Sequence, residues 1–367
     1  MAGASNVGID LHKTTLTFGL TNIEGNLVND VSMDTKCVNK ITKFVSELPR
    51  PIHCAIESVG MYEWLWELLE PIVDKLVLAD AVELRYRAGK RNASTDRVDA
   101  KFLSLLVWRN EVPEAFVPDK LTRQLRRLGR HWHGITELMT NLKIRMRWIL
   151  MQHNFPGPDV ITGPSAQKWF LAQGDHLDPL AQFTFSQMLE TIEHLERQRV
   201  GIRRLIIEFS KMDKFRDDTE LLKTVPGISE ILAAIILAEV AGFQRFYSDD
   251  AIACYTGLTE RTKESAGNHS PGHISKSGSP ILRWALCEAA NTLVRSDPIY
   301  RALYNRILRH THVKAKAKVA MAQKLIRWLW KMHKTREPFK RGGSTGHTKN
   351  ANIARLRAKA IIAPALA

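Results

Sequence analysis

Cysteine is scarce in this sequence, and the few cysteines are not grouped. Four of them are spread over 367 residues, and no two stand in a Cys-x-x-Cys spacing. Structural zinc sites and disulfide frameworks need cysteines at short, defined spacings, so we expect neither kind of site. Scattered free cysteines are typical of proteins that fold in a reducing compartment, which predicts a cytoplasmic location.

Long apolar runs are also lacking. No segment approaches the ~20 consecutive apolar residues that a membrane-spanning helix requires, and the amino terminus lacks a signal-peptide pattern. We therefore expect no membrane partner. The hydrophobic fraction of 44% is ordinary for a folded chain, and the length predicts two or three domains.

Acidic residues are too few to balance the basic ones. Lys and Arg number 53 against 38 Asp and Glu, which leaves a formal net charge of +15 and predicts a polyanionic partner, most simply nucleic acid. Residues 314–341 hold ten basic residues and one Glu, with Trp328 and Trp330 among them. Basic residues interleaved with aromatics favour phosphate contacts and base stacking. The candidate contact residues here are Lys324, Arg327 and Lys331.

Strand-like segments open the chain. Val7, Ile9 and Leu11 alternate as in a half-buried strand, residues 15–21 repeat the alternation, and a turn with Asn and Gly leads to a third strand. The further predicted elements are the third strand 27–33, helix 38–48, strand 52–58, helix 61–75, strand 76–80 and helix 96–110. Three strands followed by alternating helices and strands predict an α/β domain over residues 1–117.

The next segment, residues 118–212, has helical periodicity. Two long Arg-rich helices are predicted at about 119–154 and 185–212, with a Pro- and Gly-rich break between them. They predict either an antiparallel hairpin or coiled coil, or two helices of a bundle, and the imperfect heptads leave both interpretations open.

A mostly helical third part is predicted over residues 213–340, followed by a basic tail at 341–367 that lacks acidic residues from Gly342 on. Pro226 and Gly227 separate two apolar helical segments, as in a helix-hairpin-helix, and such a turn exposes backbone N–H groups that can hold a phosphate. A loop rich in Ser, Gly, Lys and His then precedes an apolar helix. Its candidate nucleic-acid contacts are Lys263 and Lys276.

Four carboxylates of the first domain form a candidate metal site. Asp10 stands in the first strand, Glu57 ends a later strand, and Asp96 and Asp99 lie at i and i+3 on one face of a helix. Taken singly, Asp10 is explained as the cap of a turn, Asp96 as a helix cap and Asp99 as a solvated acid. Taken together, they favour oxygen-ligand binding of divalent cations.

Two Mg²⁺ ions are the expected cofactors, with Mn²⁺ as a substitute. Mg²⁺ prefers oxygen ligands, and two ions about 4 Å apart can activate an attacking oxygen and stabilise the leaving one in phosphodiester chemistry. Four clustered acids without cations would repel one another.

Several motifs in order resemble the insertion-sequence-110 transposases, particularly their insertion-sequence-1111 branch. They are "GIDLHKTTLTFGL", "AIES", "DRVDAKFLSLL", "VPGISEILAAIILAE", "YTGLTERTKESAG" and "ISKSGSPILRWALCEAA". The resemblance implies a Holliday-junction-resolvase-like (RuvC-type) α/β domain of the ribonuclease H fold, a coiled coil and a C-terminal transposase domain. It also implies a bacterial protein, associated with the nucleoid when bound to DNA, that recombines donor and target DNA paired with a non-coding bridge RNA.

The resemblance assigns roles to particular residues. It makes the four acidic residues the metal ligands of a DEDD site, named for its three Asp and one Glu, and makes Ser265 in "KESAG" the nucleophile that forms a covalent phosphoserine intermediate. The family usually has Gly directly after this serine, where this sequence has Ala266, and "SKSGSP" is less basic than the family version. The alternative nucleophiles are Ser270, Ser275 and Ser277.

The acids and the serine lie in different predicted domains, so the resemblance implies a composite site between protomers, in a homodimer that assembles to a homotetramer. Two other functions remain open. The same four acids suit a Holliday-junction-type nuclease that uses water as nucleophile, and the basic segments alone suit a non-catalytic RNA- or DNA-binding scaffold. A sugar-kinase-like phosphotransferase is disfavoured because a second Gly-rich phosphate loop is missing.

Overall fold

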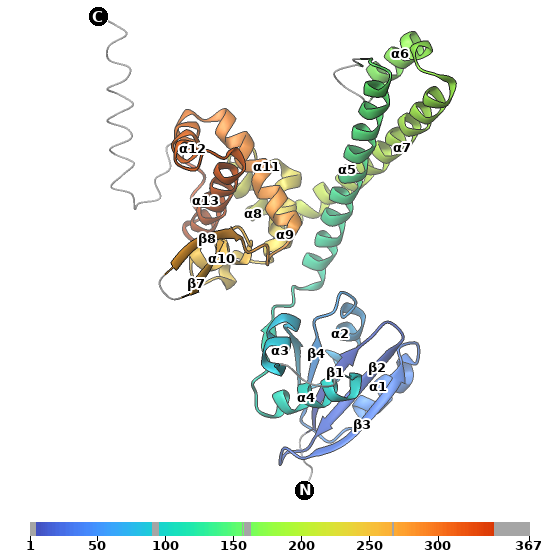
Figure 1. The fold of residues 1–367 in the computed structure, drawn as a ribbon. Coiled ribbons are helices and arrows are strands. Elements are labelled where there is room, and N and C mark those ends of the chain that lie inside the picture. Colours follow the sequence, from blue (N-terminus) through green and yellow to red (C-terminus); the bar gives the residue numbers. More distant parts are fainter. Residues whose placement is uncertain (1–4, 90–94, 156, 158–162, 266–267, 341–367) are drawn as a thin grey trace, which may run out of the picture. The chain divides into compact units, whose positions relative to one another are not determined.

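The structure is a computed structural model that describes residues 5–89, 95–155, 157, 163–265 and 268–340. The chain divides into two compact units between Val117 and Pro118 (Figure 1). Among the described residues, the helices are all too short or too polar to cross a membrane.

A six-stranded mixed sheet forms the centre of the first unit, with strand order β3-β2-β1-β4-β5-β6. The first three strands form an antiparallel meander, β1, β4 and β5 run parallel, and β6 is antiparallel to β5. The strands are β1 (Ser5–Leu11), β2 (Thr15–Thr21), β3 (Leu27–Asp34), β4 (Ile52–Glu57), β5 (Lys75–Ala79) and β6 (Glu114–Ala115). The predicted α/β organisation is therefore present.

Helices cover both faces of this sheet. Those on one face are α1 (Val38–Ser46) and α2 (Glu63–Leu69), and those on the other are α3 (Ala81–Ala88) and α4 (Asp96–Trp108). The prediction of a helix over residues 61–75 was too long, because Pro71, which follows the C-cap residue Glu70, has no N–H to donate to a further turn. The prediction missed α3, which begins after Asp80, whose side chain accepts hydrogen bonds from two backbone N–H groups of the first turn.

Two glycines let α4 lie directly on the sheet. A Cβ on Gly8 would lie 2.3 Å from the carbonyl oxygen of Ala100, and one on Gly19 would lie 2.5 Å from the same residue. At the far side of this contact, the hydroxyl groups of Thr21 and Ser104 are 2.8 Å apart. The first turn of α4 is thereby held beside the carboxyl end of β1.

The second unit opens with two long antiparallel helices, α5 (Lys120–Gln152) and α7 (Pro179–Ser210), which pack along each other and are joined through α6 (Gly163–Gln173) (Figure 1). Their outer halves share an apolar core that includes Met146 and Phe185. Their inner halves contact α9 (Glu230–Val240) and so belong to the helical core of the unit. The pair is thus a hairpin at one end and part of a bundle at the other.

The remaining helices share one hydrophobic core, in which nearly every residue of α9 is buried. These helices are α8 (Asp213–Lys223), α9 (Glu230–Val240), α10 (Asp249–Tyr255), α11 (Pro280–Ser296), α12 (Pro298–Thr311) and α13 (Lys314–Thr335). The segment predicted as a loop before α11 instead contains a two-stranded hairpin, β7 (Glu260–Ser265) and β8 (Asn268–Ile274). The composition of this segment is typical of loops. Strands form in it nevertheless, because strand formation depends on pairing with the partner segment as well as on local composition.

Candidate metal centre and nucleic-acid contacts

The register of β1 and β4 places Asp10 and Glu57 side by side. Ile9 pairs with Ile56 in the parallel ladder, and both isoleucines point into the core on the α1 and α2 face. Because side chains alternate along a strand, Asp10 and Glu57, one residue further on, both point to the face that α4 covers. Both stand at the carboxyl ends of their strands.

The first turn of α4 brings the other two carboxylates to the same edge. Thr95 caps this helix by accepting a hydrogen bond from the N–H of Val98, and Asp96 and Asp99 follow at i and i+3. Asp96 is exposed and Asp99 is half-buried. The structure therefore brings together all four acids that the sequence singled out.

His12 joins this cluster, although the sequence alone did not single it out. It follows β1 directly, and its Nε2 atom lies 3.3 Å from Oδ2 of Asp10 and 3.3 Å from Oδ1 of Asp96. The three side chains offer donor atoms that all lie within 4.8 Å of one another. The only signal in the sequence was its spacing of two residues from Asp10.

The charges in the cluster influence one another. Burial raises the pKa of the Asp10 carboxyl to about 6, His12 opposes the rise, and the negative charges of Glu57 and Asp96 add to it. The pKa of Glu57 is also raised, chiefly by burial. The negative charge of Asp99 adds to this rise, and the positive charge of Arg85 opposes it. A buried carboxyl beside two other acids, one of which faces a fourth, is a donor set that suits a divalent cation, since the cation removes the repulsion between the bare acids.

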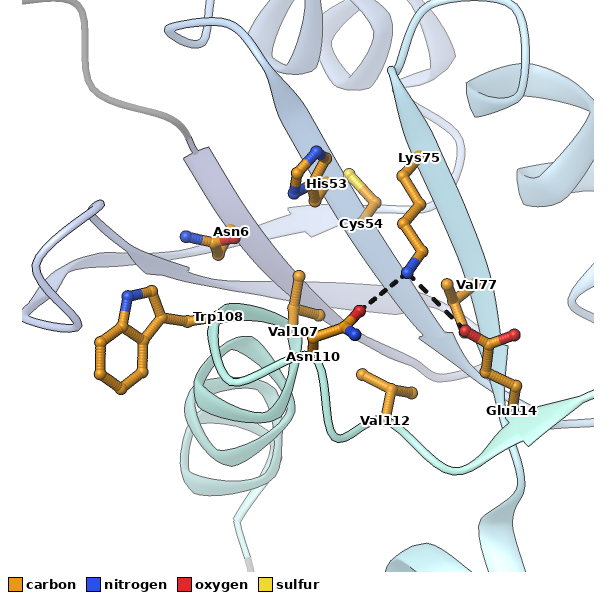
Figure 2. A pocket seen from close by; sticks show the side chains of 10 residues that line it. All are labelled: Asn6, His53, Cys54, Lys75, Val77, Val107, Trp108, Asn110, Val112 and Glu114. Carbon is orange, nitrogen blue, oxygen red and sulfur yellow. Dashed lines mark hydrogen bonds and ion pairs between the residues drawn. The ribbon is translucent and has the colours of Figure 1, made fainter.

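A hollow of about 280 Å³ lies at the opposite end of the same sheet. Figure 2 shows His53 and Lys75 in its lining, with Lys75 directed to Asn110 and Glu114. His53 and Lys75 lie at the starts of β4 and β5, whereas the acids lie at the carboxyl ends of the strands. The hollow is therefore separate from the acidic edge.

The sequence-predicted nucleophile lies in the second unit. Ser265 is the last residue of β7 and stands opposite Asn268 of β8, at the closing end of the hairpin. Residues 266–267, which include Ala266, are outside the described residues, and Lys263 is placed only by its backbone, in β7. The assignment of Ser265 as nucleophile stays a prediction.

The turn at Gly227 has a packing role. Its φ angle of +99° is unfavourable for residues with a side chain, and a Cβ there would lie 2.7 Å from the carbonyl oxygen of Ala289 on α11. Beyond the hairpin, Lys276 is exposed, and its backbone N–H donates to the carbonyl of Gly257. Contacts of both residues with nucleic acid stay predictions.

Helix α13 carries the three basic candidates of the C-terminal stretch. Arg327 lies 2.5 Å from a carboxylate oxygen of Asp250, and Lys331 lies 3.0 Å from one of Asp249, both at the start of α10. Lys324 is half-buried, and burial lowers its pKa. Two of the three candidate cations therefore have acidic partners within the chain.

The two tryptophans of α13 face the helical core. Trp328 packs edge-on against Tyr300 with ring centroids 4.9 Å apart, and the indole N–H of Trp330 donates to the carbonyl of Phe246. Both rings are partly buried against the helical core, and their stacking on bases stays a prediction.

Two family models match the chain. A transposase model of the DEDD type named for IS110 matches residues 7–155, and the model for the transposase IS116/IS110/IS902 family matches residues 219–305. Together the two matched segments span more than half of the chain. The chain belongs to the IS110 family of transposases. The first match includes all four carboxylates and His12, and the second includes the β7–β8 hairpin.

Curated relatives agree with this family. The y4pF/y4sB transposase of Sinorhizobium fredii is 26% identical over 183 residues, 48% of this chain and 46% of the relative. The transposase for insertion sequence element IS1111A of Coxiella burnetii is 24% identical over 138 residues, 37% of this chain and 38% of the relative. The chain thus spans less than half the length of these IS110-type relatives.

Proposed function

We propose that this chain is the recombinase of an insertion sequence, which cuts donor and target DNA and rejoins their strands. The observation that carries the proposal is the meeting of Asp10, Glu57, Asp96 and Asp99 at one edge of the sheet, in the segment matched by the DEDD transposase model. The relatives' names as transposases support it. The site of action would be bacterial DNA in the cytoplasm.

The first unit would be a RuvC-type domain of the ribonuclease H fold. Its antiparallel meander followed by parallel strands, with helices on both faces, supports this assignment. The carboxyl ends of β1 and β4 would then form the catalytic edge. Helices cover both faces of the sheet, so a substrate can reach it at the ends of the strands.

The four carboxylates would hold two Mg²⁺ ions. When bound, such ions neutralise charge on the phosphodiester and lower the pKa of the attacking hydroxyl. Asp10 would be the buried anchor of the set, with 5% of its surface exposed, while the exposed Asp96 would face the substrate.

Ser265 would supply the nucleophile. Its Oγ forms a bond to phosphorus while the bond from phosphorus to one deoxyribose oxygen breaks, so that the serine loses a proton and the leaving oxygen gains one. The phosphodiester energy is kept in the serine ester, and attack by a second deoxyribose hydroxyl reverses the step. Strands are rejoined without ATP and without consuming water.

The acids and Ser265 belong to different compact units, so the proposed reaction requires the units to meet. We expect them to meet between protomers, in a homodimer that assembles to a homotetramer. Donor and target DNA would be paired with a non-coding guide RNA. Candidate contacts for these nucleic acids are Gly227, Lys263, Lys276, Lys324, Arg327 and Lys331.

A covalent adduct assay tests this function. The full chain is incubated with guide RNA, donor DNA, target DNA and Mg²⁺, and the products are separated under denaturing conditions. We expect a protein–DNA adduct that Ser265→Ala abolishes, whereas Ser186→Ala, a substitution on α7, leaves it intact. Peptide mapping identifies the modified serine, and a DNA-linked peptide carrying Ser270, Ser275 or Ser277 would move the nucleophile.

Two outcomes of the same assay would contradict the recombinase. Cleavage that persists in Ser265→Ala without an adduct would favour a hydrolytic Holliday-junction-type nuclease. Nucleic-acid binding with no metal-dependent cleavage by the wild type would leave a non-catalytic scaffold.

A further inference from the structure

His12 is placed against two of the four acids by its position in the chain. It is the first residue after β1, which ends at Leu11, so it lies at the sheet edge where the carboxyl end of β1 meets the start of α4. Its side chain is 53% exposed, and Nε2, not Nδ1, is the nitrogen within 3.3 Å of both Asp10 and Asp96.

The three donor atoms have the spacing of ligands around one ion. Ligand bonds from nitrogen or oxygen to a divalent metal are about 2.0–2.2 Å, so neighbouring donor atoms lie about 3 Å apart and opposite ones about 4.4 Å apart. Here the donor atoms of Asp10, His12 and Asp96 all lie within 4.8 Å of one another. Small side-chain rotations would bring all three to a common cation.

The chemistry of the donor set differs from that of four carboxylates. Mg²⁺ prefers an all-oxygen environment, whereas an imidazole nitrogen also suits transition metals. One nitrogen ligand among carboxylates therefore shifts the relative affinity of a site from Mg²⁺ towards Mn²⁺, which binds both oxygen and nitrogen.

We propose that His12 is a direct nitrogen ligand of the cation held by Asp10 and Asp96, and that it makes this position selective for Mn²⁺ over Mg²⁺. The inference rests on the proposed function only in requiring that these acids hold a cation. It adds a fifth side chain to the four-carboxylate site and assigns Mn²⁺, in place of Mg²⁺, to this one of the two metal positions.

Pulsed electron paramagnetic resonance of Mn²⁺ bound to the untagged full-length chain tests the inference. A coordinated imidazole produces nitrogen modulation of the Mn²⁺ echo, and we expect it in the wild type and its loss in His12→Gln. The matched control is His53→Gln, which changes a histidine of the same sheet at the opposite end, beside the hollow in Figure 2, and should keep the modulation.

Metal titrations give a second readout that does not depend on DNA. His12→Gln should lower Mn²⁺ affinity by at least about 10-fold, because losing even a residue that only hydrogen-bonds to a metal ligand typically costs that much. Its effect on Mg²⁺ affinity should be much smaller. His53→Gln should change neither affinity.

Asp10→Asn separates this inference from the proposed function. If the wild type binds Mn²⁺ without nitrogen modulation and Asp10→Asn no longer binds Mn²⁺, the role of His12 is overturned and the acidic metal site is retained. Unchanged Mn²⁺ binding in Asp10→Asn would overturn the acidic metal site and the inference together. The wild-type spectrum is decisive by itself, since it needs no variant to fold.

Discussion

Gly8 of β1 and Ala100 of α4 approach so closely that no side chain fits between them. A Cβ on Gly8 would lie 2.3 Å from the carbonyl oxygen of Ala100 and 2.3 Å from the backbone nitrogen of Ser104. Asp96 and Asp99 stand in the turn of α4 just before Ala100, so this contact determines how far the helix acids are from Asp10.

Gly8→Ala should push α4 away from the sheet. We expect a stability loss of about 1–3 kcal/mol, as for overpacked cores, together with loss of metal-dependent cleavage because the acids separate. Chemical denaturation and a cleavage assay measure the two effects. The control is Gly60→Ala, where a Cβ would meet nothing within 4 Å. Equal behaviour of the two variants would contradict the role of the Gly8 contact.

The metal ligands should be separable from the nucleic-acid surface. Asp10→Asn, Glu57→Gln and Asp99→Asn should each abolish strand cleavage and leave DNA binding in a mobility-shift assay nearly unchanged, since each removes a ligand in the first unit while the basic candidates lie in the second. Glu47→Gln, an exposed acid after α1, should cleave normally. Wild-type recombination in any of the three ligand variants would remove that residue from the site.

Asp119 should make the stability depend on pH in the acid range. It caps α5 by accepting hydrogen bonds from the backbone and hydroxyl of Thr122, and it pairs with Lys214. Burial acts to raise its pKa, but the hydrogen bonds from Lys214 and Thr122 outweigh burial and hold the pKa at about 2, below its ordinary value of 3.8. The folded state therefore binds this proton less tightly than the unfolded state.

The stabilisation from Asp119 is consequently present above about pH 4 and is lost as the pH falls towards 2. Asp119→Ala should cost about 0.5–2 kcal/mol at pH 7, the usual cost of removing a helix cap, and its deficit relative to the wild type should shrink on acidification. Asp119→Asn keeps the capping oxygen and should lose only the pH-dependent part. A deficit that stays constant from pH 7 to pH 2.5 in unfolding measurements would contradict this assignment.

The charge of α13 can be tested in both directions. Replacing Lys324, Arg327 and Lys331 with Gln should weaken binding to DNA and RNA of any sequence. The salt dependence of binding should fall by about one unit of slope for each phosphate that is no longer neutralised. Binding constants measured from 50 to 300 mM salt provide the slope. An unchanged slope would show that these residues are only a solvated face.

The acidic partners on α10 provide the opposite change. Asp249→Asn and Asp250→Asn release Lys331 and Arg327 from ion pairs within the chain. We expect tighter binding and a steeper salt dependence, because the freed cations neutralise phosphates. Weaker binding in these variants would indicate that the ion pairs hold α13 in its binding-competent position.

Local patterns in the sequence determined most of the elements and the choice of acids. The alternation at Val7, Ile9 and Leu11 identified β1, because burial of one sheet face imposes a period of two residues. The spacing of Asp96 and Asp99 placed both on one face of α4, because a helix repeats every 3.6 residues. These features depend on neighbours in the chain, which a single sequence displays.

Tertiary structure decided what depends on distant segments. Asp10 stands beside Glu57 because β1 and β4 pair in one particular register, and a shift by one residue would turn one of them to the opposite face. His12 reaches Asp96 only because Gly8 and Gly19 let α4 pack on the sheet. Trp328 likewise packs towards the core because its ring contacts the ring of Tyr300, which lies on another helix. Such contacts arise between segments that share no local pattern, so they follow from packing and not from the order of residues within either segment.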